Sequence, residues 1–279
     1  VDERHAVVAL VDGELDDALQ GQRHPGVGLG DEWGEGRRGA VKRAGALLLD
    51  LRAGACGANA MDARALGDAG DAQANALLLA ALAQARPSDA VLSEESVDDL
   101  QRLHAHRVWI IDPLDGTREF REGRDDWAVH VALVADGRVL AAAVSQPARD
   151  DVFDTAPVAS GTPLPPPVAA SARRIVISRS RPPRCAQAVA DALGATLWQV
   201  GSAGAKALNV VRGEALAYVH EGGMNEWDAA APVGVALAHG LHVSDLHGEA
   251  IVFNQRDVVL HGGLVICRKE IASTLLDAV

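Results

Sequence analysis

Two aspartates three positions apart, Asp112 and Asp115, have the residue types and spacing in this 279-residue chain that most clearly suggest chemistry. They lie in the stretch WIIDPLDGTREF, residues 109–120. The apolar residues that begin this stretch predict a buried strand, and Pro113 and Gly116 predict that the strand ends there. Neighbouring carboxylates repel each other and are costly to bury unpaired. A solvated acidic turn would explain this stretch if it stood alone.

Other apolar segments also end at carboxylates. These acids are Glu94 and Glu95 after a short predicted strand, Asp68 and Asp71 just before a predicted helix, and Asp228 at the start of another helix, where Pro232 is expected in the first turn. Capping of a helix N-terminus is an alternative explanation for Asp71 and Asp228, and solvation is one for Glu95. Taken together, oxygen ligands without a His or Cys cluster favour hard cations, Mg²⁺ or Mn²⁺. Such ions would offset the repulsion and allow an acidic protein to bind phosphate.

The elements that must position these acids change in kind along the chain. In the first half, the patterns predict helices over 40–54 and 72–86, the second ended by Pro87, and strands over 90–93 and 107–112. Alternating residues around Asp136-Gly137 predict a β-hairpin. Residues 21–39 are rich in glycine and charge and predict an irregular segment. Their GVGLG lacks the strand and helix that would indicate a phosphate-binding loop.

Beyond a Pro-rich connector at 161–170, strands and helices alternate to the end of the chain. The first half therefore predicts helices on a largely antiparallel sheet, and the second half predicts an α/β arrangement. We expect an irregular N-terminal lead over 1–39, a metal-binding α+β subdomain over 40–165, and an α/β subdomain over 166–279 that completes the active site.

Composition excludes several classes of function. The formal net charge is −12, which leaves no basic footprint for a nucleic acid polymer. No apolar run approaches a membrane span, and the acidic start has no signal-peptide form, so the expected location is the cytoplasm. Cys56, Cys185 and Cys267 have no CxxC spacing, which argues against a zinc knuckle or a disulfide framework.

The order of motifs resembles a known family. DPLDGT, preceded by SEES and followed much later by EWDAAAP, resembles the signatures of the lithium-sensitive, Mg²⁺-dependent phosphatases of the inositol monophosphatase superfamily. The likeness extends over roughly residues 40–279. It implies a layered α-β-α-β-α sandwich with an antiparallel N-terminal sheet and a mixed C-terminal sheet. Arg118-Glu119-Phe120 after DGT, and GRDDWAVHVAL, resemble the actinobacterial part of the CysQ branch, whose members are 3′-phosphoadenosine-5′-phosphate (PAP) phosphatases of sulfur metabolism.

The resemblance implies roles for individual residues. Two or three Mg²⁺ ions, or Mn²⁺, would be held by Glu94, Asp112, the Leu114 carbonyl, Asp115 and Asp228, with Glu95 as a candidate ligand for a third ion. Asp71 and the Thr117 hydroxyl would orient the attacking water, and Glu94 belongs with them among the catalytic groups. The chain departs from the family at Asp71, where it reads Asp68-Ala-Gly-Asp71 in place of Thr-x-Ala-Asp.

The substrate residues implied by the resemblance surround these acids. Backbone N–H groups of Gly116 and Thr117 would bind the phosphate, with Arg118 and Asp228 beside it, and Gly201, Ser202, Ala203 and Glu221 would line the leaving-group pocket. From the residues alone, Ser178, Arg179, Arg181 and Lys206 could meet a second phosphate. A solvated strand end is the alternative explanation for the arginines.

The implied function is removal of the 3′-phosphate of PAP by a metal-activated water, without a phosphoenzyme. Inositol 1-phosphatase or fructose 1,6-bisphosphatase activity is the alternative within this chemistry, and Glu221 keeps it open. A catalytically silent, metal-binding regulatory protein is the alternative from another class. The expected partner is a small phosphate ester, with no nucleic acid polymer and no membrane, and a homodimer stays open.

Overall fold

In the computed structural model of the chain, the described residues are 32–55, 61–156 and 173–279. Two five-stranded sheets dominate them. The first has the spatial order β1 (Ala90–Ser93), β2 (Val108–Asp115), β3 (Ala128–Ala135), β4 (Arg138–Gln146) and β5 (Asp151–Asp154). The second has the order β10 (His242–Ser244), β12 (Leu264–Cys267), β8 (Ala217–His220), β6 (Arg174–Ser178) and β7 (Thr196–Val200). A short ribbon pairs β11 (Val259–Leu260) with β9 (Met224–Asn225).

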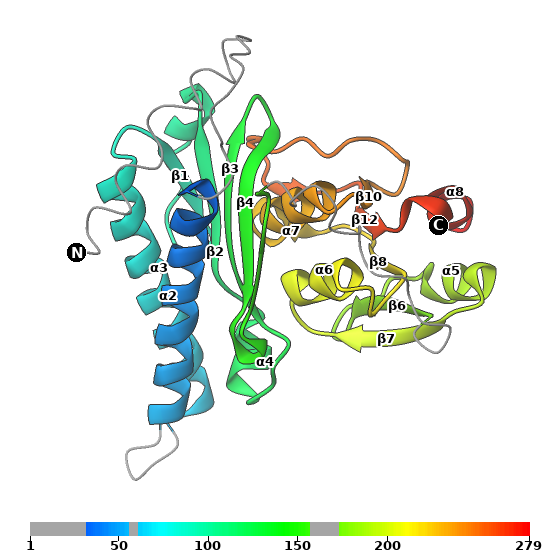
Figure 1. Cartoon of the computed structure of the whole chain (residues 1–279), viewed down its shortest axis with the longest axis horizontal. Helices are drawn as coiled ribbons and strands as arrows, with labels where there is room; N and C mark the ends of the chain where they lie inside the picture. Colours follow the sequence, from blue (N-terminus) through cyan, green and yellow to red (C-terminus); the bar gives the residue numbers. More distant parts are fainter. Residues whose placement is uncertain (1–31, 56–60, 157–172) are drawn as a thin grey trace.

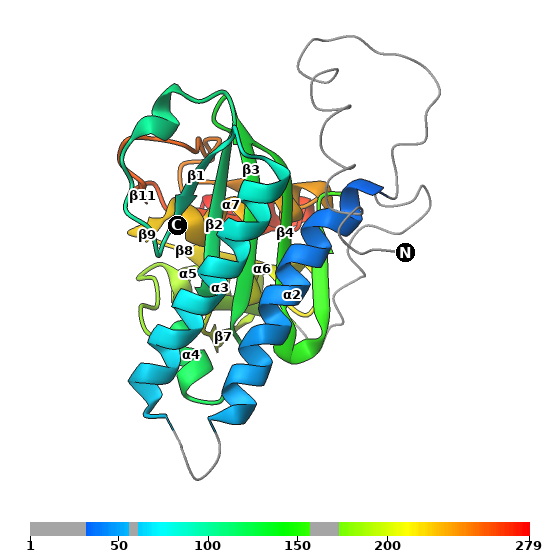
Figure 2. The same cartoon turned by 90° about the vertical axis from the view of Figure 1, so that its left-hand side faces the viewer.

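The helices form layers on and between these sheets (Figure 1). On the outer face of the first sheet lie α2 (Glu32–Gly54) and α3 (Ala63–Ala85), side by side in Figure 2 as well. Between the sheets lie α6 (Ala203–Val211) and α7 (Glu226–Ala238), and on the far face lie α5 (Ala186–Leu193) and α8 (Ala272–Leu276). The short α4 (Thr117–Arg121) follows β2, and 3₁₀ turns cover Gln101–His104, Pro147–Arg149 and Lys269–Ile271. The predicted α-β-α-β-α sandwich is confirmed.

The two sheets differ in the relative directions of their strands. In the first sheet only β1 and β2 run parallel, and all other neighbours are antiparallel, so the sheet is antiparallel apart from one edge. The second sheet is mixed, as expected, because β6 runs parallel to β7 and β8 while β12 runs antiparallel to β8. The predicted hairpin joins β3 and β4. Asp136 and Gly137 take φ values of 49° and 73°, as a tight two-residue turn requires.

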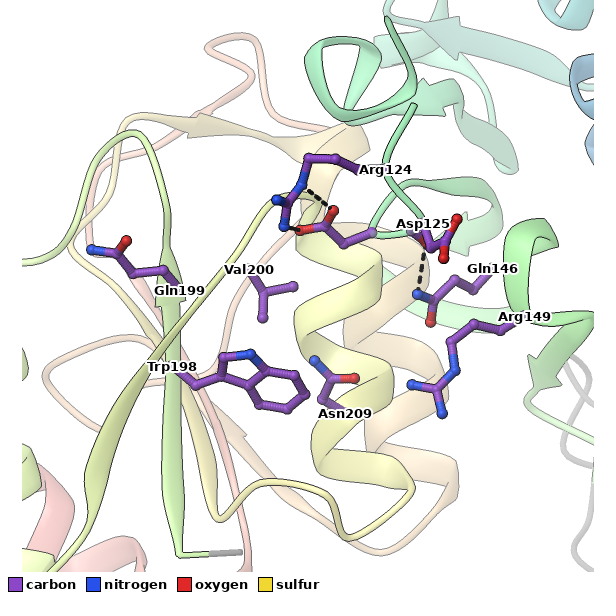
Figure 3. Close-up of a pocket in the computed structure, with 9 residues that line it drawn as sticks. Arg124, Asp125, Gln146, Arg149, Trp198, Gln199, Val200 and Asn209 are labelled. Atoms are coloured by element: carbon purple, nitrogen blue, oxygen red, sulfur yellow. Dashed lines mark hydrogen bonds and ion pairs between the residues drawn. The ribbon is translucent and has the colours of Figure 1, made fainter. Parts of the chain in front are cut away.

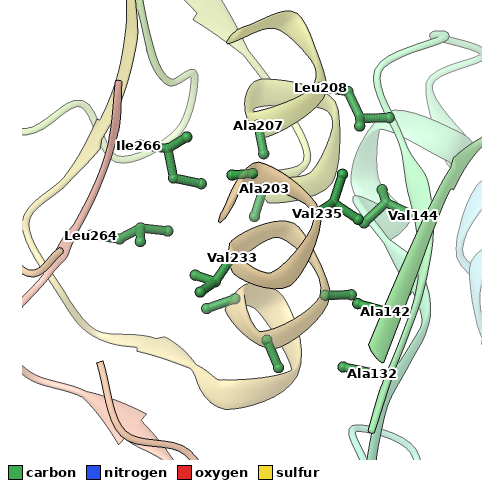
Figure 4. Close-up of a cluster of buried hydrophobic side chains, with 14 of the residues drawn as sticks. Ala132, Ala142, Val144, Ala203, Ala207, Leu208, Val233, Val235, Leu264 and Ile266 are labelled. Carbon is green, nitrogen blue, oxygen red and sulfur yellow. The ribbon is translucent and has the colours of Figure 1, made fainter. Parts of the chain in front are cut away.

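Alternation along β3 and β4 divides the core between the two faces of the first sheet. Val129, Val131 and Leu133 pack toward α2 and α3, whereas the intervening small residues face α6 and α7. Figure 4 shows Ala132, Ala142 and Val144 facing α7, with Leu264 and Ile266 of β12 on the other side of the helices. The inner helices therefore join the two sheets in one apolar layer.

Several predicted boundaries were wrong. Helix α2 begins at Glu32, so residues 32–39 are helical and not an irregular lead. Helix α3 begins at Ala63, which places the segment expected to precede it inside the helix. Strand β2 continues through Pro113 to Asp115, and Pro232 lies inside α7 beyond its first turn, where it cannot donate to the carbonyl of Asp228.

Some predictions concern residues that the structure does not describe. The lead over 1–31, Cys56 and the 161–170 connector lie outside the described residues. The subdomain boundary at 165 lies there too and stays a prediction. Among the described helices, none combines the length and the apolar character that crossing a membrane would require.

Candidate active site

Three carboxylates from distant parts of the chain meet where β2 ends and α7 begins. Asp112, Asp115 and Asp228 each offer one oxygen, and these oxygens all lie within 4.8 Å of one another. In a regular strand, residues three apart point to opposite faces. The pairing of β2 with β3 is irregular between Asp112 and Asp115, which allows both side chains to reach one cluster. Gly116, with a φ of 92°, then ends the strand.

The third carboxylate is fixed by the start of α7. Asp228 Oδ2 accepts the Asn225 backbone N–H at 2.6 Å in a capping box, so its position is tied to the first helical turn. Glu226 is fully buried beside it and accepts the N–H groups of Asn254 and Gln255, both at 2.7 Å. The helix start is therefore anchored to the 254–255 loop. Asp228 serves as a cap as well as a member of the cluster.

The cluster is electrostatically unfavourable without a cation. Burial, followed by the charges of Glu94, Asp115 and Asp228, raises the pKa of Asp112 well above its ordinary value. Burial and the charge of Asp228 raise the pKa of Glu94 to about 7, and burial and the charge of Asp115 raise that of Asp228 to about 6. Asp112 Oδ1 accepts the Leu114 N–H at 3.1 Å, but its buried Oδ2 has no hydrogen-bond partner among the described residues. An oxygen-only set with an unsatisfied buried acceptor fits a hard divalent cation.

Asp115 differs from its neighbours because donors surround one of its oxygens. Burial opposes ionisation, but the charge of His130 and hydrogen bonds outweigh it and lower the pKa of Asp115 to about 2. Its Oδ2 accepts the Ser202 hydroxyl at 2.5 Å and the Gly204 N–H at 2.7 Å, and His130 Nε2 lies 3.1 Å away. Asp115 therefore stays charged where the other acids favour protonation.

Asp71 and Thr117 are brought together as expected, although by different local structure. Asp71 lies within α3 and caps nothing, because the N-cap is Asp62, which accepts the Ala65 N–H at 2.8 Å. The Thr117 hydroxyl lies 3.2 Å from Asp71 Oδ1 and 3.2 Å from the Leu114 carbonyl. Burial and the charge of Glu95 raise the pKa of Asp71 to about 7.

Helix α3 also orients the turn that carries Glu94 and Glu95. Asn75 of α3 accepts the Ser93 hydroxyl at 2.8 Å, and Ser93 accepts the Glu95 N–H at 3.3 Å. Glu94 lies outside the group of three aspartates, yet its charge acts on Asp112. Asn75 and Ser93 were not predicted, since a polar residue on a helix face and one at a strand end carry no distinctive spacing.

A cavity of about 240 Å³ opens beside the cluster and brings most of the predicted substrate residues together. Its lining includes the predicted residues Asp115, Gly116, Thr117, Arg118, Ser178, Gly201, Ser202, Ala203 and Asp228, with Arg181 and Lys206. Lys206 is buried and donates to the carbonyls of Gly201 and Ser202. Burial lowers the pKa of Lys206 to about 8.

Two predicted substrate residues do not line this cavity. Arg179 forms ion pairs with Glu119 at 2.8 Å and Glu122 at 2.7 Å, which tie the end of β6 to α4. Glu221 is exposed and accepts the Cys185 N–H at 3.1 Å. Arg181, by contrast, lines the cavity, and its guanidinium has no ion pair among the residues that the structure describes.

A second cavity, of about 480 Å³, is lined by residues from both halves of the chain (Figure 3). Trp198 and Asn209 face it from the second half of the chain, and Gln146 donates to the Asp125 carbonyl at 3.0 Å on the other side. Its arginines are already paired, Arg124 with Asp126 at 2.7 Å and Arg149 with Glu214 at 2.7 Å. It therefore lacks the unpaired charge that an anionic ligand would require.

Comparison with known proteins places this site in context. The profile of the inositol monophosphatase family matches residues 31–279. The 3′-phosphoadenosine 5′-phosphate phosphatase of Mycobacterium bovis is 50% identical over 221 residues, 77% of this chain and 82% of the relative. The crystal structure of CysQ from Bacteroides thetaiotaomicron, at 22% identity, superposes with a TM-score of 0.69 over 84% of this chain and 96% of that one. An IMPase/NADP phosphatase solved with Mg²⁺ and phosphate is 22% identical, with a TM-score of 0.61 over 75% of this chain and 79% of that one.

Proposed function

The chain belongs to the inositol monophosphatase family, and we propose that within this family it is a Mg²⁺-dependent phosphatase that removes the 3′-phosphate of PAP, yielding AMP and phosphate. The observation that carries the proposal is the meeting of Asp112, Asp115 and Asp228 within 4.8 Å beside a cavity that also contains Lys206 and Arg181. The mycobacterial relative's activity supports the choice of PAP. The Mg²⁺ bound by a protein of the same fold supports the choice of metal.

The proposed metal ligands are Asp112, Asp115 and Asp228, with Glu94 and the Leu114 carbonyl completing a site for two or three ions, Mg²⁺ or Mn²⁺. Bound divalent cations would supply charge neutralisation and a more acidic water. Hydrolysis of a phosphate monoester is among the slowest uncatalysed reactions, and enzymes accelerate such reactions by up to ~10²¹-fold. Because the proposed attack by water uses no nucleophilic side chain, positioning and charge must provide most of this acceleration.

The protein's own groups have separate tasks in this proposal. Thr117 and Asp71, 3.2 Å apart, hold the attacking water, and Asp71 takes its proton. Gly116 and Thr117 present backbone N–H groups to the phosphate. Ser202 and the Gly204 N–H hold Asp115 in place from the opposite side.

Arg181 is the residue we propose for the second phosphate of a bisphosphate nucleotide. It lines the cavity, it is exposed, and no acidic side chain among the described residues pairs with it. Arg179 is assigned instead to the contact between β6 and α4, because two glutamates already bind its guanidinium. Ser178 accepts the Arg181 N–H at 3.1 Å and fixes the turn between them.

A comparison of substrates tests the proposal. We expect phosphate release in Mg²⁺ from PAP with a higher kcat/KM than from inositol 1-phosphate or fructose 1,6-bisphosphate, and inhibition by Li⁺. A higher kcat/KM for inositol 1-phosphate would make inositol 1-phosphate, and not PAP, the proposed substrate. If phosphate is released from none of the three substrates at saturating Mg²⁺, the proposed enzymatic activity is contradicted, and a catalytically silent, metal-binding protein is favoured.

A further inference from the structure

We propose that His130 is a positioning residue that sets the separation between the acids of the first sheet and the acid of α7. The inference rests on the proposed metal role of Asp112, Asp115 and Asp228. It concerns a residue to which the sequence analysis assigned no role, although the quoted stretch GRDDWAVHVAL contains it. His130 lies on β3, its ring fully buried between the first sheet and the helices α6 and α7.

The position of His130 in the sheet brings it next to the acids of β2. In the pairing of β2 and β3 it stands directly opposite Asp112, which is the last pair before the irregular stretch that ends at Asp115 and Ala128. Paired residues on neighbouring antiparallel strands lie close enough for their side chains to interact. His130 is therefore placed at the site where the sheet departs from regular pairing to bring two acids together.

The side chain of His130 contacts both sides of the cluster. Nε2 lies 3.1 Å from Asp115 Oδ2, and Nδ1 lies 3.2 Å from the carbonyl of Trp227, the residue before Asp228. Because a carbonyl oxygen only accepts hydrogen bonds, Nδ1 carries a hydrogen and donates it to Trp227. The imidazole thus spans the distance from a sheet carboxylate to the first turn of α7.

The residues around the ring fit this role. A side chain on Gly204 would collide with His130 Nε2, so glycine at this position leaves room for the ring. The Gly204 N–H and the Ser202 hydroxyl both donate to Asp115 Oδ2, the oxygen that Nε2 also faces. Because these groups occupy Oδ2, Oδ1 of Asp115 is left as the oxygen that would bind a cation in the proposed site. Partners of metal ligands orient them in this way, and their loss costs about 10–100-fold in metal affinity.

Direct binding of Mn²⁺ to the substrate-free protein, followed by electron paramagnetic resonance, tests the inference without measuring activity. We expect His130→Leu, which removes both contacts, to weaken Mn²⁺ binding by roughly 10–100-fold. His130→Gln places an amide N–H near the position of Nε2, 3.1 Å from Asp115 in the wild type, and should recover most of the affinity. His130→Asn, whose amide reaches only toward Trp227, should bind Mn²⁺ less tightly than His130→Gln.

The matched control is Val144→Ala. Val144 is fully buried on β4, faces the same apolar layer and pairs with His130 across the two strands. The Val144→Ala substitution should lower the thermal stability of the protein without changing its affinity for Mn²⁺. Should His130→Leu not fold, the comparison of His130→Gln with His130→Asn decides the question alone.

The outcomes separate this inference from the proposed function. Wild-type Mn²⁺ affinity in both His130→Leu and His130→Asn, or equal losses in Val144→Ala, would overturn the positioning role and leave the proposed function standing. Failure of the wild-type protein to bind Mn²⁺ at all would overturn the proposed metal site itself, and the inference with it.

Discussion

At the scale of single residues, Asp112 is the carboxylate with the least compensation from the protein. It is 1% exposed, its Oδ2 has no hydrogen-bond partner in the described part of the chain, and three other acids act on it. A buried charge in this state is costly unless a cation binds it. The residue therefore destabilises the metal-free protein in exchange for a binding site.

Asp112→Asn tests this trade directly. We expect the metal-dependent activity to fall by about 10²–10³-fold, the scale for losing one strong electrostatic group in an active site. The metal-free protein should unfold at an equal or higher temperature, because the substitution removes a source of repulsion and keeps an acceptor for the Leu114 N–H. Activity assays and thermal unfolding in EDTA measure the two effects.

The control for this substitution is Asp68→Asn on α3. Its side chain is 69% exposed and lies 3.9 Å from Arg64, outside the cluster of three aspartates, although its charge adds to the raised pKa of Asp71. At pH 8, above that pKa of about 7, Asp68→Asn should change neither activity nor stability by much. Full activity in Asp112→Asn, or an equal loss in Asp68→Asn, would refute the ligand assignment.

Asp71 should give the activity a dependence on pH. Because burial and Glu95 raise its pKa to about 7, a growing fraction of Asp71 is protonated below that pH and cannot take a proton from water. We expect kcat/KM at saturating Mg²⁺ to fall about tenfold per pH unit below this value. A pH–rate profile from pH 5 to 9 measures this fall in kcat/KM, the acidic limb of the profile.

Two variants check the assignment to Asp71. Asp71→Asn should lower the activity and abolish the acidic limb, whereas Glu95→Gln should move the limb to lower pH because it removes a negative charge near Asp71. An unchanged limb in Asp71→Asn would show that another group titrates.

Single residues were predicted where a motif of several residues marked them. The prediction that Asp112, Asp115 and Asp228 lie together agrees with the structure because DPLDGT and EWDAAAP carry a distinctive order. His130 sits in an apolar strand where one polar residue gives no spacing to interpret. Glu221 was expected in the pocket, but the conformation of the turn at Gly222 and Gly223, which both have positive φ, could not be foreseen.

At the scale of elements, helix α3 shows why boundaries were harder to predict than element types. Asp68 and Asp71 were expected just before the helix, yet both lie inside it, as do Gly67 and Gly70. A Cβ on Gly67 would lie 2.6 Å from Arg121 Cδ and 2.9 Å from Thr117 Cγ2, and one on Gly70 would lie 3.0 Å from Leu114 Cδ2. The glycines allow α3 to approach β2 and α4 closely, which puts Asp71 beside Thr117. The role of these glycines depends on packing between elements, which the local sequence does not show.

The turn after β6 yields a prediction about substrate selectivity. Arg181→Ala should raise KM for PAP by roughly 10–100-fold, since a hydrogen bond to a charged group contributes about 1.5–3 kcal/mol. Hydrolysis of adenosine 3′-phosphate, which lacks the second phosphate, should change little. Steady-state kinetics on both substrates measure the difference.

Arg179→Ala is the matched variant two residues away. It leaves the buried Glu119 without its arginine, so we expect lower thermal stability and no selective effect on PAP. Equal effects of Arg181→Ala on the two substrates would remove Arg181 from the second phosphate, as would a PAP-specific loss in Arg179→Ala.

At the scale of the whole molecule, the cluster joins the two halves, since Asp112 and Asp115 come from the first sheet and Asp228 from a helix of the second half. The layer order followed from the resemblance and from the change in strand and helix rhythm near residue 161. The strands β9, β10 and β11 were not predicted, because two or three residues hold too little periodicity, and β5, which begins and ends with aspartate, was not predicted either.

Joining the halves through repelling acids should make stability depend on pH and metal together. Glu94 and Asp228 have folded-state pKa values of about 7 and about 6, above their ordinary values, so the folded state binds their protons more tightly than the unfolded state does. The free energy of unfolding of the metal-free protein should therefore fall as pH rises from about 4 to about 7. Asp115, with a pKa of about 2, gains its stabilising effect below this window and adds no slope within it.

Thermal unfolding at pH 5 and pH 8, in EDTA and in Mg²⁺, measures this coupling. In EDTA we expect a lower Tm at pH 8, by at least the 2–4 °C that about 1 kcal/mol represents for a domain of this order of size. Mg²⁺ should raise Tm more at pH 8 than at pH 5, and Asp228→Asn should reduce both differences. A metal-free Tm that rises from pH 5 to pH 8 would contradict the repulsion described for the cluster.

The most direct test of the shared metal site is anomalous diffraction from crystals of the protein soaked in Mn²⁺. We expect anomalous peaks at about 2.0–2.3 Å from carboxylate oxygens of Asp112, Asp115 and Asp228, within the usual range for hard cations. Anomalous peaks only at other places, with no ion at these three aspartates, would contradict the shared metal site.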